Sequence, residues 1–188
     1  MPDVPEPAAG PRRRGLTPDS VGAVPAVALV TCAALPELDA DDQLIAPALA
    51  ALGVEAVPAV WSDPAVDWEA FDLVVLRNPW DDTDRLAEFL AWAGSVRRLA
   101  NPADVLAWNA DKRYLGELAA AGLPVVETFF VAPGDEVPAL DREVVAKPTV
   151  SAGSRDTERF VPQAREALLA HVAALHGDGR TVMVQPYL

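Results

Sequence analysis

Two lysines are the residues of this chain that most clearly suggest a ligand. The sequence holds 15 lysines and arginines, and only Lys112 and Lys147 are lysines. A lysine ammonium is a compact charge on a flexible stem, and a planar guanidinium does not simply replace it as a partner for phosphate. We therefore take both lysines as candidates for binding a polyphosphate.

The segment around Lys112 has the pattern of a helix start. Asn109 is expected to cap a helix over about residues 109–121, which Gly122 ends. A lysine in the first turn is disfavoured by the helix dipole by about 0.3–1 kcal/mol, and a bound anion would turn this cost into attraction. The alternative for this segment by itself is a solvated lysine paired with Asp111.

Lys147 closes an apolar strand pattern, and Pro148 ends it. A small, polar loop follows, with backbone donors and hydroxyls that can close over phosphate oxygens. It lacks the spacing of a P-loop, and an ordinary Ser/Gly hairpin loop has a similar composition. The loop consists of Ser151, Ala152, Gly153, Ser154, Arg155, Asp156 and Thr157.

The elements that must position these residues fall into three parts. Residues 1–24 contain five prolines and a triple arginine, and we expect a disordered leader there. Residues 25–100 alternate short apolar runs with helical spacing, which predicts a small open parallel-sheet α/β domain. The runs are Val27–Thr31, Val54–Val60 and Phe71–Arg77.

Two amphipathic helices are expected in that first domain. The second is the cleaner pattern, with Leu86, Phe89, Leu90 and Ala93 on one face. For the first, we expect Asp41 or Asp42 as the cap, Gly53 as the stop, and a kink at Pro47. Its apolar face is expected to hold Leu44, Ile45, Ala48, Leu49 and Leu52.

Residues 101–188 change pattern, because strand pairs flanked by helices replace the regular alternation. We expect an α+β lobe there, with a helix over Gln163–Leu175. The expected strands are Val125–Val131, Glu143–Lys147, Thr157–Val161 and Thr181–Gln185.

The order of these elements resembles the ATP-grasp superfamily, and within it the O-ureido-D-serine cyclo-ligase type and its uncharacterised relatives. The resemblance covers a domain that precedes the ATP-grasp region and the first nucleotide-binding lobe. The stretches that carry it are Val27–Cys32, Leu73–Arg77 with Trp80 and Asp81, Asn101 with Pro102, Asn109–Lys112, Val145–Pro148, Ser151–Thr157 and Gln185–Leu188.

The resemblance implies a role for each matching residue. Lys112 and Lys147 resemble the two lysines that contact the nucleotide phosphates, with Lys147 also near the adenine. Ser151, Ala152, Gly153, Ser154 and Arg155 resemble the lid over the β- and γ-phosphates. Gln185, Pro186, Tyr187 and Leu188 resemble the adenine hinge, in which the Pro186 carbonyl and the Leu188 amide would contact the base and Tyr187 would mainly pack.

The implied reaction is ATP-dependent activation of a carboxylate to an acyl phosphate, followed by attack of an amine. The family uses Mg²⁺, whose ligands we expect in a second lobe beyond Leu188, so no metal ligand is assigned here. We accordingly expect a truncated ligase that binds ATP weakly and does not turn over alone. The alternatives are a non-catalytic nucleotide-binding or interaction module, and an unrelated small α/β binding domain.

Other polar residues receive weaker interpretations. Arg77 lies at the carboxyl end of an expected strand, where open α/β sheets bind ligands, and it is the candidate for substrate binding. The acids after it suit a polar turn, in which Asp81 or Asp82 caps the next helix. We expect Asp39, Asp41 and Asp42 to be solvated, the five tryptophans to be mainly packing residues, and His171 and His176 to have no role in a metal site.

Composition excludes several classes of protein. A formal charge of −13 and a pI near 4.4 argue against binding to nucleic acid or to an anionic membrane. Cys32 is the only cysteine, which excludes an internal disulfide. No apolar run resembles a signal peptide or a membrane span. We expect a cytoplasmic protein whose partners are ATP and small carboxylates and amines, and a homodimer stays open.

Overall fold

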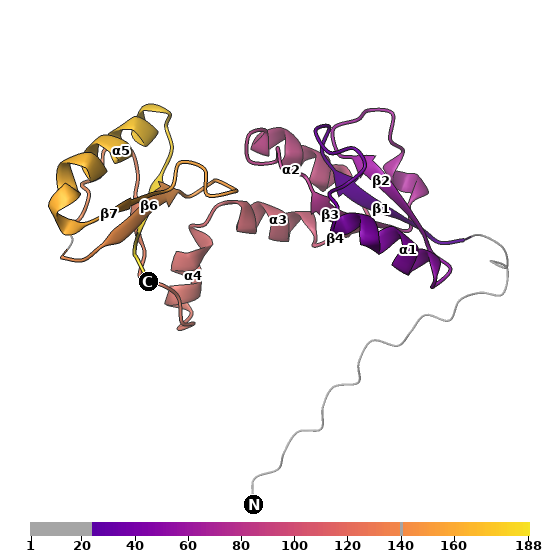
Figure 1. Cartoon of the computed structure of the whole chain (residues 1–188), viewed down its shortest axis with the longest axis horizontal. Helices are drawn as coiled ribbons and strands as arrows, with labels where there is room; N and C mark the ends of the chain where they lie inside the picture. Colours follow the sequence, from indigo (N-terminus) through magenta and orange to yellow (C-terminus); the bar gives the residue numbers. More distant parts are fainter. Residues whose placement is uncertain (1–23, 140) are drawn as a thin grey trace, which may run out of the picture.

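A computed structural model describes residues 24–139 and 141–188, which form two separate sheets joined by helices (Figure 1). The expected leader at residues 1–24 lies outside the described residues, apart from Val24. None of the helices in the described ranges is long and apolar enough to cross a membrane.

The first sheet is parallel, as the alternating pattern predicted. It contains four strands in the order β2-β1-β3-β4. Both β3 and β2 pair with the central strand β1. The strands are β1 (Ala26–Thr31), β2 (Glu55–Val60), β3 (Leu73–Asn78) and the two-residue β4 (Leu99–Ala100), which the sequence patterns did not predict.

Helix α2 (Leu86–Ser95) buries Phe89 and Ala93, as its spacing predicted, and Phe89 packs in the core with the sheet. Two aromatic rings, Trp61 and Phe89, lie in the core between helix and sheet among smaller side chains. Trp61 is 1% exposed and meets the Phe89 ring edge-on, with 5.4 Å between the centroids. Cys32 is buried in the same core, which fits a packing role.

The prediction of the first helix is wrong about its cap, its kink and its apolar face. The helical segment is a short 3₁₀ turn (Asp42–Leu44) followed by α1 (Ile45–Ala50). Pro47 lies in the first turn of α1 and does not interrupt it, because an amide at that position has no partner within the helix. Leu44 and Leu52 belong to the expected apolar face, but they are 70% and 78% exposed and do not lie in the core. No side-chain cap comes from Asp41, whereas Asp39 accepts from the Asp42 amide at 2.8 Å.

The second sheet is antiparallel, with the order β5-β8-β6-β7. Helix α5 (Arg165–Gly177), preceded by a 3₁₀ turn (Pro162–Ala164), covers one face of it (Figure 1). The core there is aliphatic and includes Val144, Val184, Leu168 and Leu175. Its strands are β5 (Phe129–Val131), β6 (Val144–Pro148), β7 (Glu158–Phe160) and β8 (Val182–Pro186).

The two sheets together confirm the expected α/β class, with boundaries that differ in detail. The strand expected from Val125 begins only at Phe129, because the Leu123–Thr128 segment has no ladder partner among the described residues. The other three strands of this part begin one residue later than expected. Two of them, β6 and β8, continue into a terminal proline, Pro148 and Pro186.

The connector contradicts the expected helix over residues 109–121. Two helices, α3 (Ala103–Ala110) and α4 (Tyr114–Ala120), meet at a break, and Asn109 lies near the end of α3 instead of at a start. Asp111 is extended at that break, and its carboxylate accepts from the Arg113 amide at 3.0 Å. Asp111 thus stabilises the turn before α4, and Lys112 lies between the two helices.

Candidate functional site

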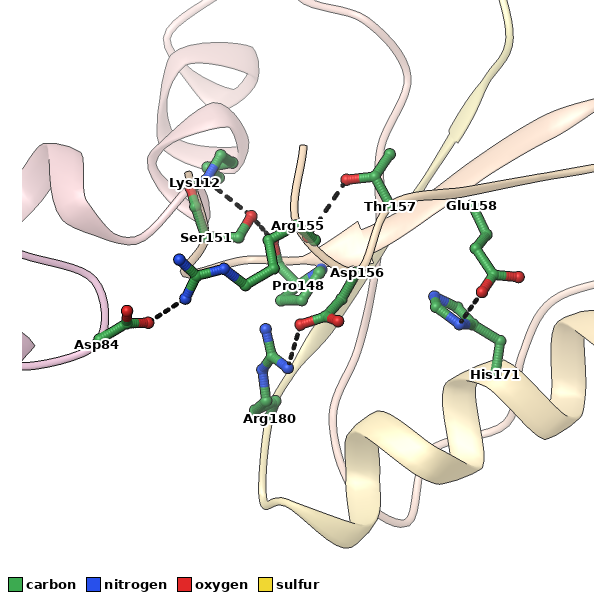
Figure 2. A network of polar contacts seen from close by, with 10 residues as sticks. All are labelled: Asp84, Lys112, Pro148, Ser151, Arg155, Asp156, Thr157, Glu158, His171 and Arg180. Atoms are coloured by element: carbon green, nitrogen blue, oxygen red, sulfur yellow. Dashed lines mark hydrogen bonds and ion pairs between the residues drawn. The ribbon is translucent and has the colours of Figure 1, made fainter. Parts of the chain in front are cut away.

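The break between α3 and α4 places Lys112 at the end of β6, where the polar loop begins. Its amide donates to the Thr149 carbonyl at 2.9 Å. Its ammonium donates to the Ser151 carbonyl at 2.6 Å, as Figure 2 shows, and more weakly to the Thr149 carbonyl at 3.4 Å. The connector and the start of the loop are therefore joined through one lysine.

The two lysines lie close enough to affect each other. Burial lowers the pKa of Lys112 below the usual value, and the positive charge of Lys147 lowers it further. The carboxylates of Asp111 and Asp82 act in the opposite direction and do not cancel the shift. Two cations that repel each other in a partly buried place would be stabilised by a shared anion.

The strand register places Lys147 on the sheet face opposite α5. Along β6, Val144 and Ala146 belong to the core under α5, so Val145 and Lys147 point to the other face, which we call the open face. Lys147 is paired with Met183 across β8, and Val145 with Gln185. Among the described residues, Lys147 has no ion pair or side-chain hydrogen bond. Its ammonium is thus available to a ligand on the open face.

The polar loop is built from two successive turns. Gly153, Ser154 and Asp156 all have positive φ angles, between 55° and 60°. Such angles are uncommon for residues with a side chain, although Asp adopts them more readily than most. The Arg155 amide donates to the Ala152 carbonyl, and the Thr157 amide to the Ser154 carbonyl. The loop projects its exposed residues beyond the end of β6.

Arg155 is paired with an acidic residue of the first sheet unit in this structure. Its guanidinium pairs with Asp84, in the segment between β3 and α2, and Asp156 pairs with Arg180 at 2.7 Å (Figure 2). These side chains line a cavity of about 500 Å³ together with Arg113. Neither Lys112 nor Lys147 lines it. The loop therefore faces the first sheet unit as well as the lysine pair.

The expected hinge lies at the end of β8 on the open face. Gln185 donates through Nε2 to the Thr128 hydroxyl at 2.9 Å. The Tyr187 amide donates to the Glu143 carbonyl at 2.9 Å, and the guanidinium of Arg159 lies 3.8 Å from the centre of the Tyr187 ring. Sequence reasoning missed both Arg159 and Glu143, because only the pairing of β6, β7 and β8 brings them to Tyr187.

Arg77 has a fixed acidic partner in the first sheet unit. Its Nε donates to the Asp42 carboxylate at 2.8 Å, and Asp42 is 5% exposed. The expectation that Asp42 is solvated is therefore wrong, because the neighbouring guanidinium compensates its burial. Asp39 is likewise bonded, since its carboxylate accepts from Asn78 at 2.9 Å. The role of Arg77 in substrate binding stays a prediction.

The acids after β3 have structural partners. Asp81 accepts from the Trp61 indole at 2.7 Å and pairs with Arg85 at 3.3 Å. Burial raises the pKa of Asp82 above the usual value. His171 pairs with Glu158 at 3.5 Å, and no group of three or more metal-ligating side chains gathers in the described part of the chain.

Taken as a whole, the described residues form a parallel α/β unit followed by an antiparallel sheet, with both lysines and the polar loop at one end of that second sheet. This combination of sheets is found in the ATP-grasp fold. A crystal structure of a RimK domain ATP-grasp protein from Sphaerobacter thermophilus matches with a TM-score of 0.62 at 24% identity, over 87% of this chain and 64% of that one.

Matches with higher sequence identity come from DcsG proteins. The family model described as the N-terminal domain of D-cycloserine synthetase DcsG matches residues 27–101. The cycloserine biosynthesis protein DcsG of Streptomyces lavendulae is 39% identical over 175 residues. A crystal structure of D-cycloserine synthetase DcsG matches with a TM-score of 0.75 at 38% identity, over 87% of this chain and 59% of that chain.

These matches confirm the resemblance found in the sequence: the chain is a homologue of DcsG, and its structural neighbours are ATP-grasp ligases. The match to the S. lavendulae protein covers 86% of this chain and 58% of the relative.

Proposed function

We propose that this chain binds ATP and forms the nucleotide-binding part of a ligase that joins a carboxylate to an amine. The observation that carries the proposal is the lysine pair, in which burial and Lys147 lower the pKa of Lys112. A polyphosphate placed between the two ammonium groups would replace their repulsion by two charge-assisted contacts. Homology to DcsG supports the same assignment.

Each residue set has a part in this proposal. Lys112 and Lys147 neutralise phosphate oxygens, and the loop from Ser151 to Arg155 closes over them with backbone donors. The strand end from Gln185 to Leu188 presents backbone groups to the adenine. Arg77 faces the second substrate.

The proposed reaction follows the ligase class. ATP phosphorylates a carboxylate, the acyl phosphate forms with release of ADP, and an amine displaces the phosphate. Mg²⁺ accompanies ATP, and its ligands lie outside the described residues. We place the protein in the cytoplasm, with small-molecule substrates, and a homodimer as one possible assembly.

The proposal is tested by titrating the chain with ATP and Mg²⁺ in the wild type, Lys112→Ala and Lys147→Ala. We expect each substitution to weaken binding about tenfold or more, since a hydrogen bond from a charged donor contributes about 1.5–3 kcal/mol. Arg97→Ala is the matched control, because it removes an exposed cation paired with Glu69 in the first sheet unit. Equal affinity in all four proteins would overturn the nucleotide assignment.

Turnover is a separate measurement. ADP release is followed with the purified chain, ATP, a small carboxylate and an amine. Binding without ADP release would assign nucleotide binding to these residues and the chemistry to a longer assembly. Substrate-dependent ADP release would show that the present residues suffice.

A further inference from the structure

A side-chain cluster on the open face has no part in the lysine pair or the loop. Arg159 of β7 contacts the Glu143 carboxylate through both Nε and Nη2, at 2.5 and 3.0 Å. The same guanidinium lies over the Tyr187 ring at 3.8 Å. One arginine thus joins the residue before β6 to the residue after β8.

The register explains why these three residues meet. Val145 of β6 is opposite Arg159 on one side and opposite Gln185 on the other. Glu143 and Tyr187 come one step further along the same face, two residues from Val145 and Gln185. The cluster therefore lies next to Gln185. It is on the same sheet face as Lys147 but at the opposite end of β6.

The cluster lies where the ladder between β6 and the β8 segment ends. The outermost backbone bond there runs from the Tyr187 amide to the Glu143 carbonyl, at 2.9 Å. A bidentate arginine–carboxylate pair and a stacked guanidinium both restrict orientation more than a single exposed contact does.

We propose that Arg159 is a positioning residue for the nucleotide base. Held by Glu143, it fixes Tyr187 and thereby sets the directions of the Pro186 carbonyl and the Leu188 amide on either side. It touches the strand end and not the ligand, so it acts on the base-binding end and leaves the phosphate-binding end unchanged. The inference rests on the proposed nucleotide function.

The test compares two ligands that share the polyphosphate and differ in the base, ADP and inorganic tripolyphosphate. In Arg159→Leu we expect ADP affinity to fall about tenfold while tripolyphosphate affinity stays within twofold of the wild type. Arg159→Lys keeps a cation over the ring but loses the bidentate pair, so its ADP affinity should lie between the two. Arg97→Leu, at another exposed ion pair, is the matched control and should change neither affinity.

A second readout needs no ligand. Hydrogen exchange at the Tyr187 amide should be at least several-fold faster in Arg159→Leu than in the wild type, while the Val184 amide in the middle of β8 is unchanged. If Arg159→Leu fails to fold, Glu143→Gln keeps the shape of the partner, removes its charge, and should show the same selective loss of ADP affinity.

The outcomes separate the two proposals. Wild-type chain that binds neither ligand overturns the nucleotide function and this inference with it. Suppose instead that the wild-type chain binds both ligands and that the variants keep its ratio of ADP affinity to tripolyphosphate affinity. This result overturns only the positioning role. An equal loss for both ligands also overturns it, because that result describes a general structural residue.

Discussion

The two sheet units are stabilised by different kinds of core. In the first, Trp61, Phe89 and Trp92 form a connected set of rings, with centroids 5.4 to 6.0 Å apart. In the second, valines and leucines fill the space under α5, and Phe160 is the one aromatic side chain in the cluster. The first unit thus combines small buried residues with a group of large aromatic rings, whereas the second relies almost wholly on aliphatic side chains.

We also expect the two units to differ in their main role, with the first contributing to stability and the second to ligand binding. The rings of the first unit pack against one another, and the Trp61 indole also donates to Asp81. In the second unit Lys147 and Gln185 lie on the sheet face opposite α5, where Met183 is buried and both polar side chains are partly exposed. We therefore expect substitutions in the two cores to lower the free energy of unfolding. Substitutions at the lysine pair should weaken ligand binding without unfolding the protein.

The largest effect is expected from Trp61→Ala. It removes a side chain that is 1% exposed and contacts two other rings, so we expect a loss of about 3–5 kcal/mol of unfolding free energy. Chemical denaturation followed by far-UV circular dichroism measures it. Trp80→Ala, at a tryptophan that is 57% exposed, is the control and should change stability little. Similar losses in both variants would contradict the aromatic core.

The matching experiment in the second unit is Leu168→Ala. Leu168 is 3% exposed, and its truncation should cost about 2–5 kcal/mol, whereas its neighbour Leu169 is 41% exposed and serves as the control. All five tryptophans lie at or before Trp108. If the units unfold separately, tryptophan fluorescence should shift less than circular dichroism in Leu168→Ala. Equal shifts would show one cooperative unit.

The next effect concerns pH and the lysine pair. The pKa of Lys112 lies below its usual 10.5, because of burial and Lys147. The cost of keeping it charged in the folded state is therefore present at neutral pH and disappears as pH rises from the lowered pKa toward 10.5. Polyphosphate needs the charged form, so ATP affinity should fall over that same range, by about ten- to hundredfold.

Binding isotherms between neutral pH and the upper end of that range measure the effect. Lys112→Arg is the control, because a guanidinium stays charged throughout and its affinity should depend less on pH. An affinity profile of the wild type that is as flat as that of Lys112→Arg would contradict the role of Lys112.

The smallest effect is expected at the contact between the units. Arg155 and Asp84 are both about half exposed, so Asp84→Asn should change stability by less than about 1 kcal/mol. The substitution releases Arg155 from its acidic partner, and we expect ATP affinity to rise a few-fold at low salt. Glu37→Gln, at an exposed residue, controls for net charge. Weaker ATP binding in Asp84→Asn would show that Asp84 supports the loop in its binding form.

Sequence reasoning predicted the repetitive elements of the fold. The parallel sheet and α2 follow from apolar periodicity, which is a local property of the chain. Boundaries near polar residues were harder, because several side chains can cap the same turn. At the connector, Asn109 was the expected cap, but the chain is helical through Ala110 and breaks at Asp111, whose carboxylate accepts from the Arg113 amide.

The contacts around the candidate site could not be predicted in the same way. Arg155 and Asp84 are 71 residues apart, and Arg159 and Tyr187 come from strands that meet only through β6. No local pattern specifies such pairs, since exposed arginines and acids occur throughout the chain. The order of motifs did identify the ATP-grasp relationship, because it depends on sequence positions alone.

The sequence by itself singled out Lys112 and Lys147 as candidates for binding a polyphosphate, since they are its only two lysines and each lies beside an expected strand or helix end. Alternation along β6 also required Val145 and Lys147 to share a face. Only the tertiary structure decided which face that is, because α5 packs on the side of Val144 and Ala146, so Lys147 lies on the opposite side. It also decided that the two lysines lie together, through the bonds of Lys112 to the end of β6.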